Sequence, residues 1–154
     1  MTCADLCCEG FRTVGRIREL QTSRDRSHIP VCCGVYAVIW PTGVPAEFLK
    51  ENAGRPAATV DPSIIEQAWV SDSDILYIGS TIRALRKRIA ELIRHGQGRT
   101  EKHKGGEWIW QISGISRALL IAFETSDPGG LEAQVLETFR GQHGGRLPFA
   151  NRRL

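Results

Sequence analysis

Two short apolar runs, GVYAVIW at residues 34–40 and ILYIGS at residues 75–80, constrain the fold more than any other part of this sequence. Both are rich in β-branched and aromatic residues, which is typical of buried strands. Each also carries one tyrosine near a glycine, although a buried phenol needs a hydrogen-bond partner. The pattern therefore predicts two core strands that carry Tyr36 and Tyr77. A phenol on each core strand indicates a role beyond apolar packing.

The remaining hydrophobic patterns predict helices, one further strand and one insertion. We expect strands at 31–40, 75–79 and within RALLIAFET (117–125), and helices at 10–22, 81–95 and 128–142. Asp127 as N-cap and Pro128 in the first turn favour the last helix. We divide the chain into a helical extension, residues 1–30, and a domain, residues 31–154, with an acidic insertion at 41–74. The insertion contains two short helical patterns, PAEFLKEN and PSIIEQAW, whereas EWIWQI fits a helix or a strand.

Size and composition fit one globular domain in the cytoplasm. A chain of 154 residues buries about two-thirds of its surface without covalent staples. No apolar run approaches the ~20 residues that cross a bilayer, and the N-terminus lacks a signal-peptide pattern. Five cysteines, two pairs of them adjacent in sequence, lie before residue 34 and suit a reducing compartment. A zinc site is the alternative, although the usual CxxC spacing is missing.

The charge is distributed unevenly along the chain. Residues 83–104 contain eight Lys or Arg against two Glu, whereas residues 42–74 contain six acidic residues against two basic ones. A basic stretch in a nearly balanced protein indicates a surface that faces a polyanion such as DNA, although a solvated helix face explains the charge equally well. The candidate nucleic-acid-binding residues are Arg86, Lys87, Arg94, Arg99, Lys102, Lys104 and Arg152.

Two predicted helices carry polar groups close to their apolar faces. At about 100° per residue, Arg88 falls on the flank of the apolar stripe of the 81–95 helix, and His95 lies on the same side about 10 Å further along. Glu132 falls inside the buried arc of the 128–142 helix. An inward carboxylate is costly unless it is paired or binds a metal. The alternative is that Glu132 interacts with the amides of the first helical turn.

Taken in order, GVY (34–36), YIG (77–79), Arg88, Glu132 and Asn151 resemble the motifs of the GIY-YIG nuclease family. The resemblance covers about residues 31–152. It implies an α/β (α+β) domain with a small three-stranded antiparallel sheet flanked by helices. It also implies divalent-metal-dependent hydrolysis of DNA phosphodiester bonds.

The resemblance also implies a role for each motif residue. Tyr36 and Tyr77 would face each other, one of them acting on the attacking water, and Tyr36 is the base that we favour. Arg88 would hold the scissile phosphate, and Glu132 would bind one Mg²⁺ or Mn²⁺. Asn151 would position the groups on the metal side or order the site. A single carboxylate suffices, because Mg²⁺ keeps several of its waters.

The sequence departs from the family pattern at three points. The tyrosines stand 41 residues apart, and the intervening segment could form a lid, a dimer surface or a partner site. Leu92 stands where the family often has His or Tyr, with His95 or His103 as the auxiliary substitutes. Ser80 stands where some members carry lysine. Two alternatives to an endonuclease therefore remain: a non-catalytic nucleic-acid-binding module and a subunit that binds a protein partner through residues 42–74. The DNA substrate is not predictable, because the chain has no recognisable sequence-reading motif.

Overall fold

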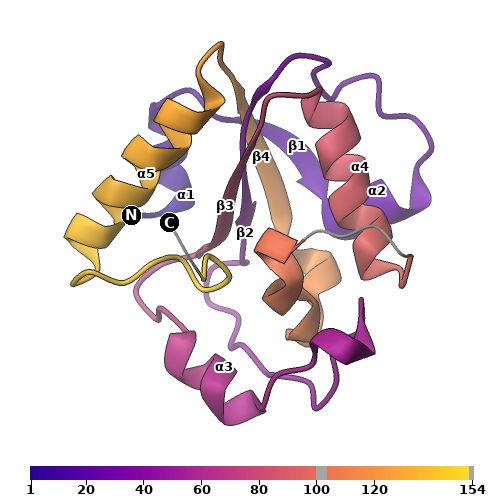
Figure 1. The fold of residues 1–154 in the computed structure, drawn as a ribbon, viewed down its shortest axis with the longest axis vertical. Helices are drawn as coiled ribbons and strands as arrows, with labels where there is room; N and C mark the ends of the chain where they lie inside the picture. Colours follow the sequence, from indigo (N-terminus) through magenta and orange to yellow (C-terminus); the bar gives the residue numbers. More distant parts are fainter. Residues whose placement is uncertain (100–103, 153–154) are drawn as a thin grey trace.

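An antiparallel sheet with the strand order β1-β4-β2-β3 forms the centre of the protein in this computed structural model, which describes residues 1–99 and 104–152 (Figure 1). Within the described residues, the strands are β1 (Arg12–Arg16), β2 (Gly34–Ile39), β3 (Ile75–Thr81) and β4 (Leu119–Glu124). The α-helices are α1 (Cys3–Cys8), α2 (Ile17–Thr22), α3 (Pro62–Ala68), α4 (Leu85–Gly96) and α5 (Pro128–Gln142). Short 3₁₀ segments are η1 (Pro56–Ala58), η2 (Lys104–Gln111) and η3 (Ile115–Arg117). The predicted fold class, α+β with a helix-flanked antiparallel sheet, is confirmed, but the sheet has four strands where three were expected.

The additional strand is β1, which lies in a segment that the sequence predicted as a helix over 10–22. Its burial pattern is irregular because the pairing with β4 shifts between Thr13 and Gly15. Gly15 adopts a φ of 144°, which L side chains rarely adopt. This irregularity gives the apolar residues a spacing of three that resembles a helical stripe. The helix prediction is therefore correct only for α2, and the first thirty residues add a strand to the sheet.

Two other elements differ from the predictions, and two agree. β3 continues through Thr81, so α4 begins at Leu85 and not at residue 81. PAEFLKEN forms no helix; its Phe48 instead makes an isolated β-bridge with Ile112. The 62–68 helix of the insertion is confirmed as α3. The last helix is confirmed over Pro128–Gln142, with the Asp127 carboxylate accepting a hydrogen bond from the Gly130 amide.

The two faces of the sheet pack against different helices. Side chains alternate between the faces along a strand, so Tyr36, Val38 and Tyr77 share one face and pack in a cluster with residues of α4. Val35, Ala37 and Ile78 lie on the other face, in a cluster with residues of α5. Figure 1 shows α4 and α5 on opposite flanks of β3. The two tyrosines therefore face α4, and β3 is an edge strand of the sheet.

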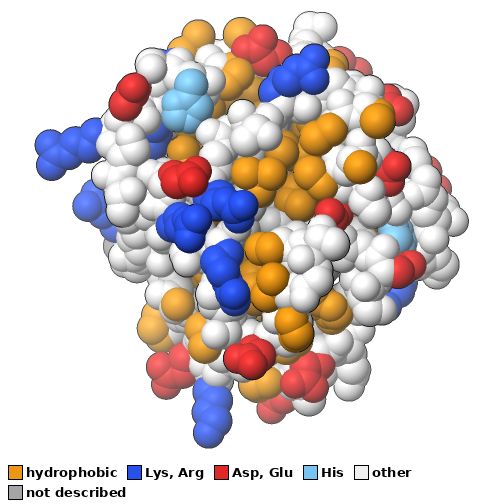
Figure 2. Space-filling model, turned by 180° about the vertical axis from the view of Figure 1, so that it is seen from behind, with side chains coloured by type: hydrophobic (Ala, Val, Ile, Leu, Met, Phe, Trp, Pro, Cys, Tyr) orange, Lys and Arg blue, Asp and Glu red, His pale blue; other side chains and the backbone are white. Residues whose placement is uncertain are grey.

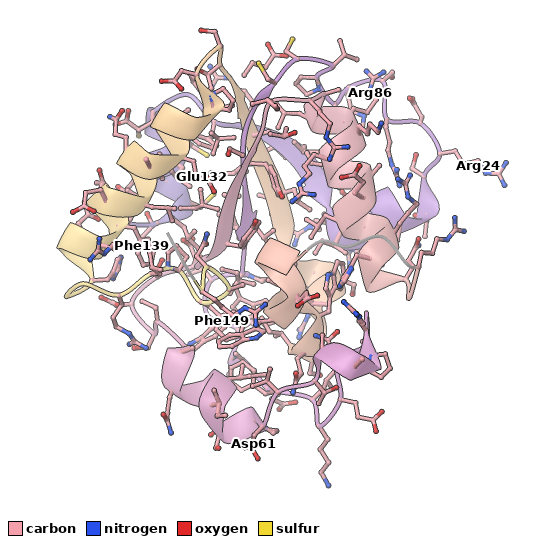
Figure 3. The ribbon with its side chains drawn as sticks, in the orientation of Figure 1. Arg24, Asp61, Arg86, Glu132, Phe139 and Phe149 are labelled. Carbon is pink, nitrogen blue, oxygen red and sulfur yellow. The ribbon has the colours of Figure 1, made fainter. Side chains whose placement is uncertain are left out.

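The insertion at 41–74 packs against the rest of the domain. The rings of Phe48 and Trp69 lie 5.8 and 5.3 Å from that of Phe149, which precedes the C-terminal residues (Figure 3). The buried Gln111 side chain accepts a hydrogen bond from the Val60 amide and donates two more, to the carbonyls of Leu49 and Val60. Across residues 1–99 and 104–152, no helix has the length and apolar character needed to span a membrane.

Candidate active site

The hydroxyl groups of Tyr36 and Tyr77 meet above Gly79. Tyr36 pairs with Gly79 across the β2–β3 ladder, and Tyr77 is its diagonal neighbour on the same face. The two ring centroids are 5.9 Å apart. A Cβ at position 79 would lie 2.7 Å from the Tyr77 hydroxyl oxygen and 3.0 Å from that of Tyr36. Glycine is therefore required at this position because the two phenols occupy the space of a side chain, and the tyrosine–glycine pattern has a steric cause.

Both phenols are held in their neutral form. Burial, followed by the proximity of Tyr77, raises the pKa of Tyr36 well above its ordinary value, against the influence of Arg88. Burial also raises the pKa of Tyr77, and the charge of Glu132 adds to the effect. The hydrogen bond between the two hydroxyls raises the pKa of Tyr36 but lowers that of Tyr77, as expected when Tyr36 donates. Tyr77 is consequently the phenol whose anion is better stabilised.

Arg88 projects from α4 toward this pair. Its guanidinium hydrogen bonds with the Tyr36 side chain. Burial lowers the pKa of Arg88, but the nearby phenols and Glu91 outweigh this effect and raise it overall, so the group remains a cation. Nη1 of Arg88 also lies 3.3 Å from Oε2 of Glu91.

Sequence reasoning did not identify Glu91 as part of this site. Both terminal nitrogens of Arg83 donate to its carboxylate at 2.8 Å, and hydrogen bonds from Arg83 lower the pKa of Glu91. Its spacing of three residues from Arg88 on one helix is the signal that would have found it. Glu91 pairs with both Arg83 and Arg88, so it anchors Arg88 while its single negative charge is shared between two cations.

Glu132 reaches the same strand from the opposite side of the sheet. Figure 3 shows it on α5, beside β3. The hydroxyl of Ser80 donates to its Oε2 at 2.5 Å. Ser80 follows Gly79 in β3, and its side chain points to the opposite face of the sheet. The Glu132 carboxylate therefore contacts the residue next to Gly79, on which the two phenols meet. Sequence reasoning named Ser80 only as an auxiliary residue, and the structure makes it the direct partner of Glu132.

The surroundings of Glu132 fit a magnesium ion that keeps most of its waters. In the described part of the chain its carboxylate accepts one hydrogen bond, on Oε2, which leaves Oε1 to act as a ligand. Mg²⁺ at substrate phosphates commonly takes only one or two protein carboxylates. A closed cage of side chains is not present: within residues 1–99 and 104–152, no three His, Cys, Asp or Glu residues gather closely enough to hold a metal. The same observation gives no support to a cysteine zinc site, and the five cysteines have free thiols.

Asn151 holds the edge strand β3. Its Oδ1 accepts from the Ile78 amide at 2.9 Å, and its Nδ2 donates to the Ile78 carbonyl at 2.7 Å. The Ala150 amide bonds to the Leu76 carbonyl in the same way. Ile78 stands between Tyr77 and Gly79, so the C-terminal tail fixes the backbone on which the phenols rest. The expected role of Asn151, either positioning the groups on the metal side or ordering the site, stays a prediction.

The predicted basic residues have different surroundings. Lys87 and Arg99 are exposed, and Arg94 is half-buried. Nε and Nη2 of Arg86 donate to the carbonyls of Ile29 and Ser27, so its guanidinium holds the loop before β2. Lys102 lies outside the described residues, and the side chain of Lys104 is not described. Figure 2 shows Lys and Arg side chains beside an apolar patch on the face away from the view of Figure 1.

The auxiliary histidines do not join the cluster in the described structure. His95 is 1% exposed and lies in the core at the end of α4, so solvent and a phosphate do not reach its ring. His103 lies outside the described residues. Leu92 is fully buried among the α4-side core residues, where a polar group would need a partner.

Comparisons with family models, curated proteins and solved structures find no match for this chain.

Proposed function

We propose that this protein is a GIY-YIG-type, divalent-metal-dependent endonuclease that hydrolyses DNA phosphodiester bonds at the Tyr36–Tyr77–Arg88–Glu132 cluster. One observation carries the proposal. Two phenols, a guanidinium and a carboxylate from four separate elements converge around Gly79 and Ser80. Burial of the two phenols beside a guanidinium is costly for folding alone, and polar groups with shifted pKa values, as Tyr36, Tyr77 and Arg88 have, are characteristic of functional sites.

Each group has a role that its chemistry suits. Arg88 remains charged and can hold two oxygens of a phosphate through its planar fork of donors. Tyr77 accepts from Tyr36 and interacts electrostatically with Glu132, so we propose it as the group that orients the attacking water, in place of the Tyr36 chosen from sequence. Ser80 fixes the rotamer of Glu132, the residue that would hold Mg²⁺ or Mn²⁺. The bound ion supplies positive charge that stabilises the phosphate oxygens.

The decisive experiment is nicking of supercoiled plasmid DNA in Mg²⁺ or Mn²⁺, with EDTA as the blank. Glu132→Gln should lower the rate at least about a hundredfold, as expected when a transition-state interaction is removed. Glu137→Gln is the matched control, because Glu137 is exposed on the same helix and pairs only with Arg140 among the described residues. Nicking that is lost equally in both variants, or that is insensitive to EDTA, would contradict the proposal.

One observation favours a non-catalytic nucleic-acid-binding module as the second candidate. The pKa of each phenol is raised, so neither is prepared to accept a proton without a ligand nearby. This candidate predicts salt-sensitive DNA binding with no metal-dependent cleavage of duplexes, forks or flaps. A role for residues 42–74 in binding a protein partner is a separate proposal, which deletion of α3 in a pull-down assay would test.

A further inference from the structure

A shallow hollow of about 340 Å³ lies at the C-terminal tail, which is hydrogen bonded to the edge strand β3. The C-terminal tail, η2 and α3 form its walls, which include Trp108, Phe149, Arg146, Arg152 and Gln67. Asn151 also lines it and is bonded to Ile78, next to Tyr77. The hollow is therefore connected to the candidate active site through a single side chain.

The walls of the hollow combine aromatic rings with cations. The guanidinium carbon of Arg152 lies 5.2 Å from the centroid of the Trp108 ring, within the range of a cation–π contact. Nη2 of Arg152 is held 3.2 Å from the Glu107 carboxylate. Glu107 is buried behind this pair and is not part of the lining. The Arg152–Trp108 pair thus presents an aromatic ring beside a partly exposed cationic side chain, which we call the Arg152–Trp108 platform.

A second arginine adds to the positive charge. Nη2 of Arg146 donates to the carbonyls of Gln67 and Trp69, which holds the exposed residue at the rim. No Asp or Glu is among the described residues that line the hollow. Aromatic and guanidinium planes between basic side chains are the features on which proteins stack the bases of single-stranded nucleic acid.

We propose that this hollow binds one unpaired nucleobase of the DNA strand that is cut at β3, stacked on the Arg152–Trp108 platform with its phosphate near Arg146. The volume is close to the lower limit of ligand pockets, which suits a single nucleotide and excludes a duplex. The inference rests on the proposed function and names its substrate class: DNA with a bulged or displaced nucleotide beside the cleavage site.

Binding in EDTA to two matched duplexes tests this inference. One duplex is fully paired, and the other carries a single bulged 2-aminopurine, whose fluorescence reports stacking. We expect the bulged duplex to bind about tenfold more tightly, which corresponds to about 1.4 kcal/mol, with quenching of the probe. Arg152→Lys keeps the charge but loses the planar group, so it should reduce the preference for the bulged over the paired duplex to less than about twofold.

Two further variants complete the test. Trp108→Leu should abolish quenching of the 2-aminopurine fluorescence. If Trp108→Leu has a lowered melting temperature, the test relies on Arg152→Lys instead. Arg140→Lys is the control, since Arg140 lies on α5 and pairs with Glu137. Equal binding of both duplexes by the wild type, or a preference that survives Arg152→Lys, would overturn the inference. A preference for the bulged duplex without plasmid nicking would instead support base binding in the hollow and contradict the proposed endonuclease activity.

Discussion

Replacing Gly79 with alanine perturbs the candidate site with the smallest possible change. The new Cβ would lie 2.7 Å from the Tyr77 hydroxyl and 3.0 Å from that of Tyr36, whereas ordinary contacts begin at 3.4 Å. The two hydroxyls must therefore retreat by about 0.7 and 0.4 Å, the differences between these distances. Both rings are buried against α4, so neither has space to swing aside.

The cost of this displacement follows from known responses to overpacking. An extra methyl group in a filled core typically destabilises a protein by about 1–3 kcal/mol, and we expect a loss in this range. Catalysis should be more sensitive, because misplacing a reacting group by about 1 Å can lower a rate about a hundredfold. We therefore expect nicking by Gly79→Ala to be about ten- to a hundredfold slower.

Two assays separate these effects: urea unfolding and the initial rate of plasmid nicking. Gly129→Ala is the matched control, because its Cβ position in α5 has no neighbour within 4 Å apart from adjacent residues and the backbone of the helix itself. It should leave the nicking rate unchanged and add up to about 1 kcal/mol of stability. An unfolding midpoint and nicking rate for Gly79→Ala equal to those of the wild type would refute the steric reasoning.

Three further predictions concern stability. Asn151→Leu should cost about 2–4 kcal/mol in urea unfolding, because the Ile78 amide and carbonyl lose their side-chain partner; a smaller effect would mean that water replaces the amide. Gln111→Leu should cost a similar amount by releasing the backbone of the insertion, and proteolysis within 41–74 should accelerate. For Tyr36, the folded-state pKa lies above the unfolded value of 10.0, so its contribution to stability is complete below pH 10 and is lost as the pH rises further. Above pH 10, the free energy of unfolding derived from melting curves should fall by about 1.4 kcal/mol per pH unit because of this group. Tyr36→Phe should remove this contribution to the slope.

Secondary structure could be predicted from the sequence wherever the local pattern and the tertiary structure favour the same element. The strands that carry the tyrosines have continuous apolar runs, and the helix at Pro128–Gln142 has a cap and proline at its start. The β1 segment was misread because its irregular pairing gives a strand a helical spacing of apolar residues. PAEFLKEN was misread because a long-range bridge at Phe48 overrides its local preference.

For the candidate site, the sequence identified the residues but did not predict which of them are in contact. Projection of α5 placed Glu132 inward, which agrees with its contact to Ser80, yet nothing in the local pattern links residues 52 positions apart. The same limit applies to Glu107, whose two arginine partners, Arg55 and Arg152, come from distant segments. Such contacts depend on strand order and on the path of the tail, which a single sequence does not encode in any short window.

The edge position of β3 explains how groups from both faces of a sheet can serve one ligand. Tyr77 and Ser80 point to opposite faces, and in a central strand the neighbouring backbone would separate them. At an edge, a ligand can contact both sides, and we propose that Arg88 from the α4 face and Glu132 from the α5 face approach one phosphate in this way. An exposed edge also invites pairing with another chain. Asn151 occupies that edge at Ile78, beside the site that we propose, and so blocks pairing of another chain there.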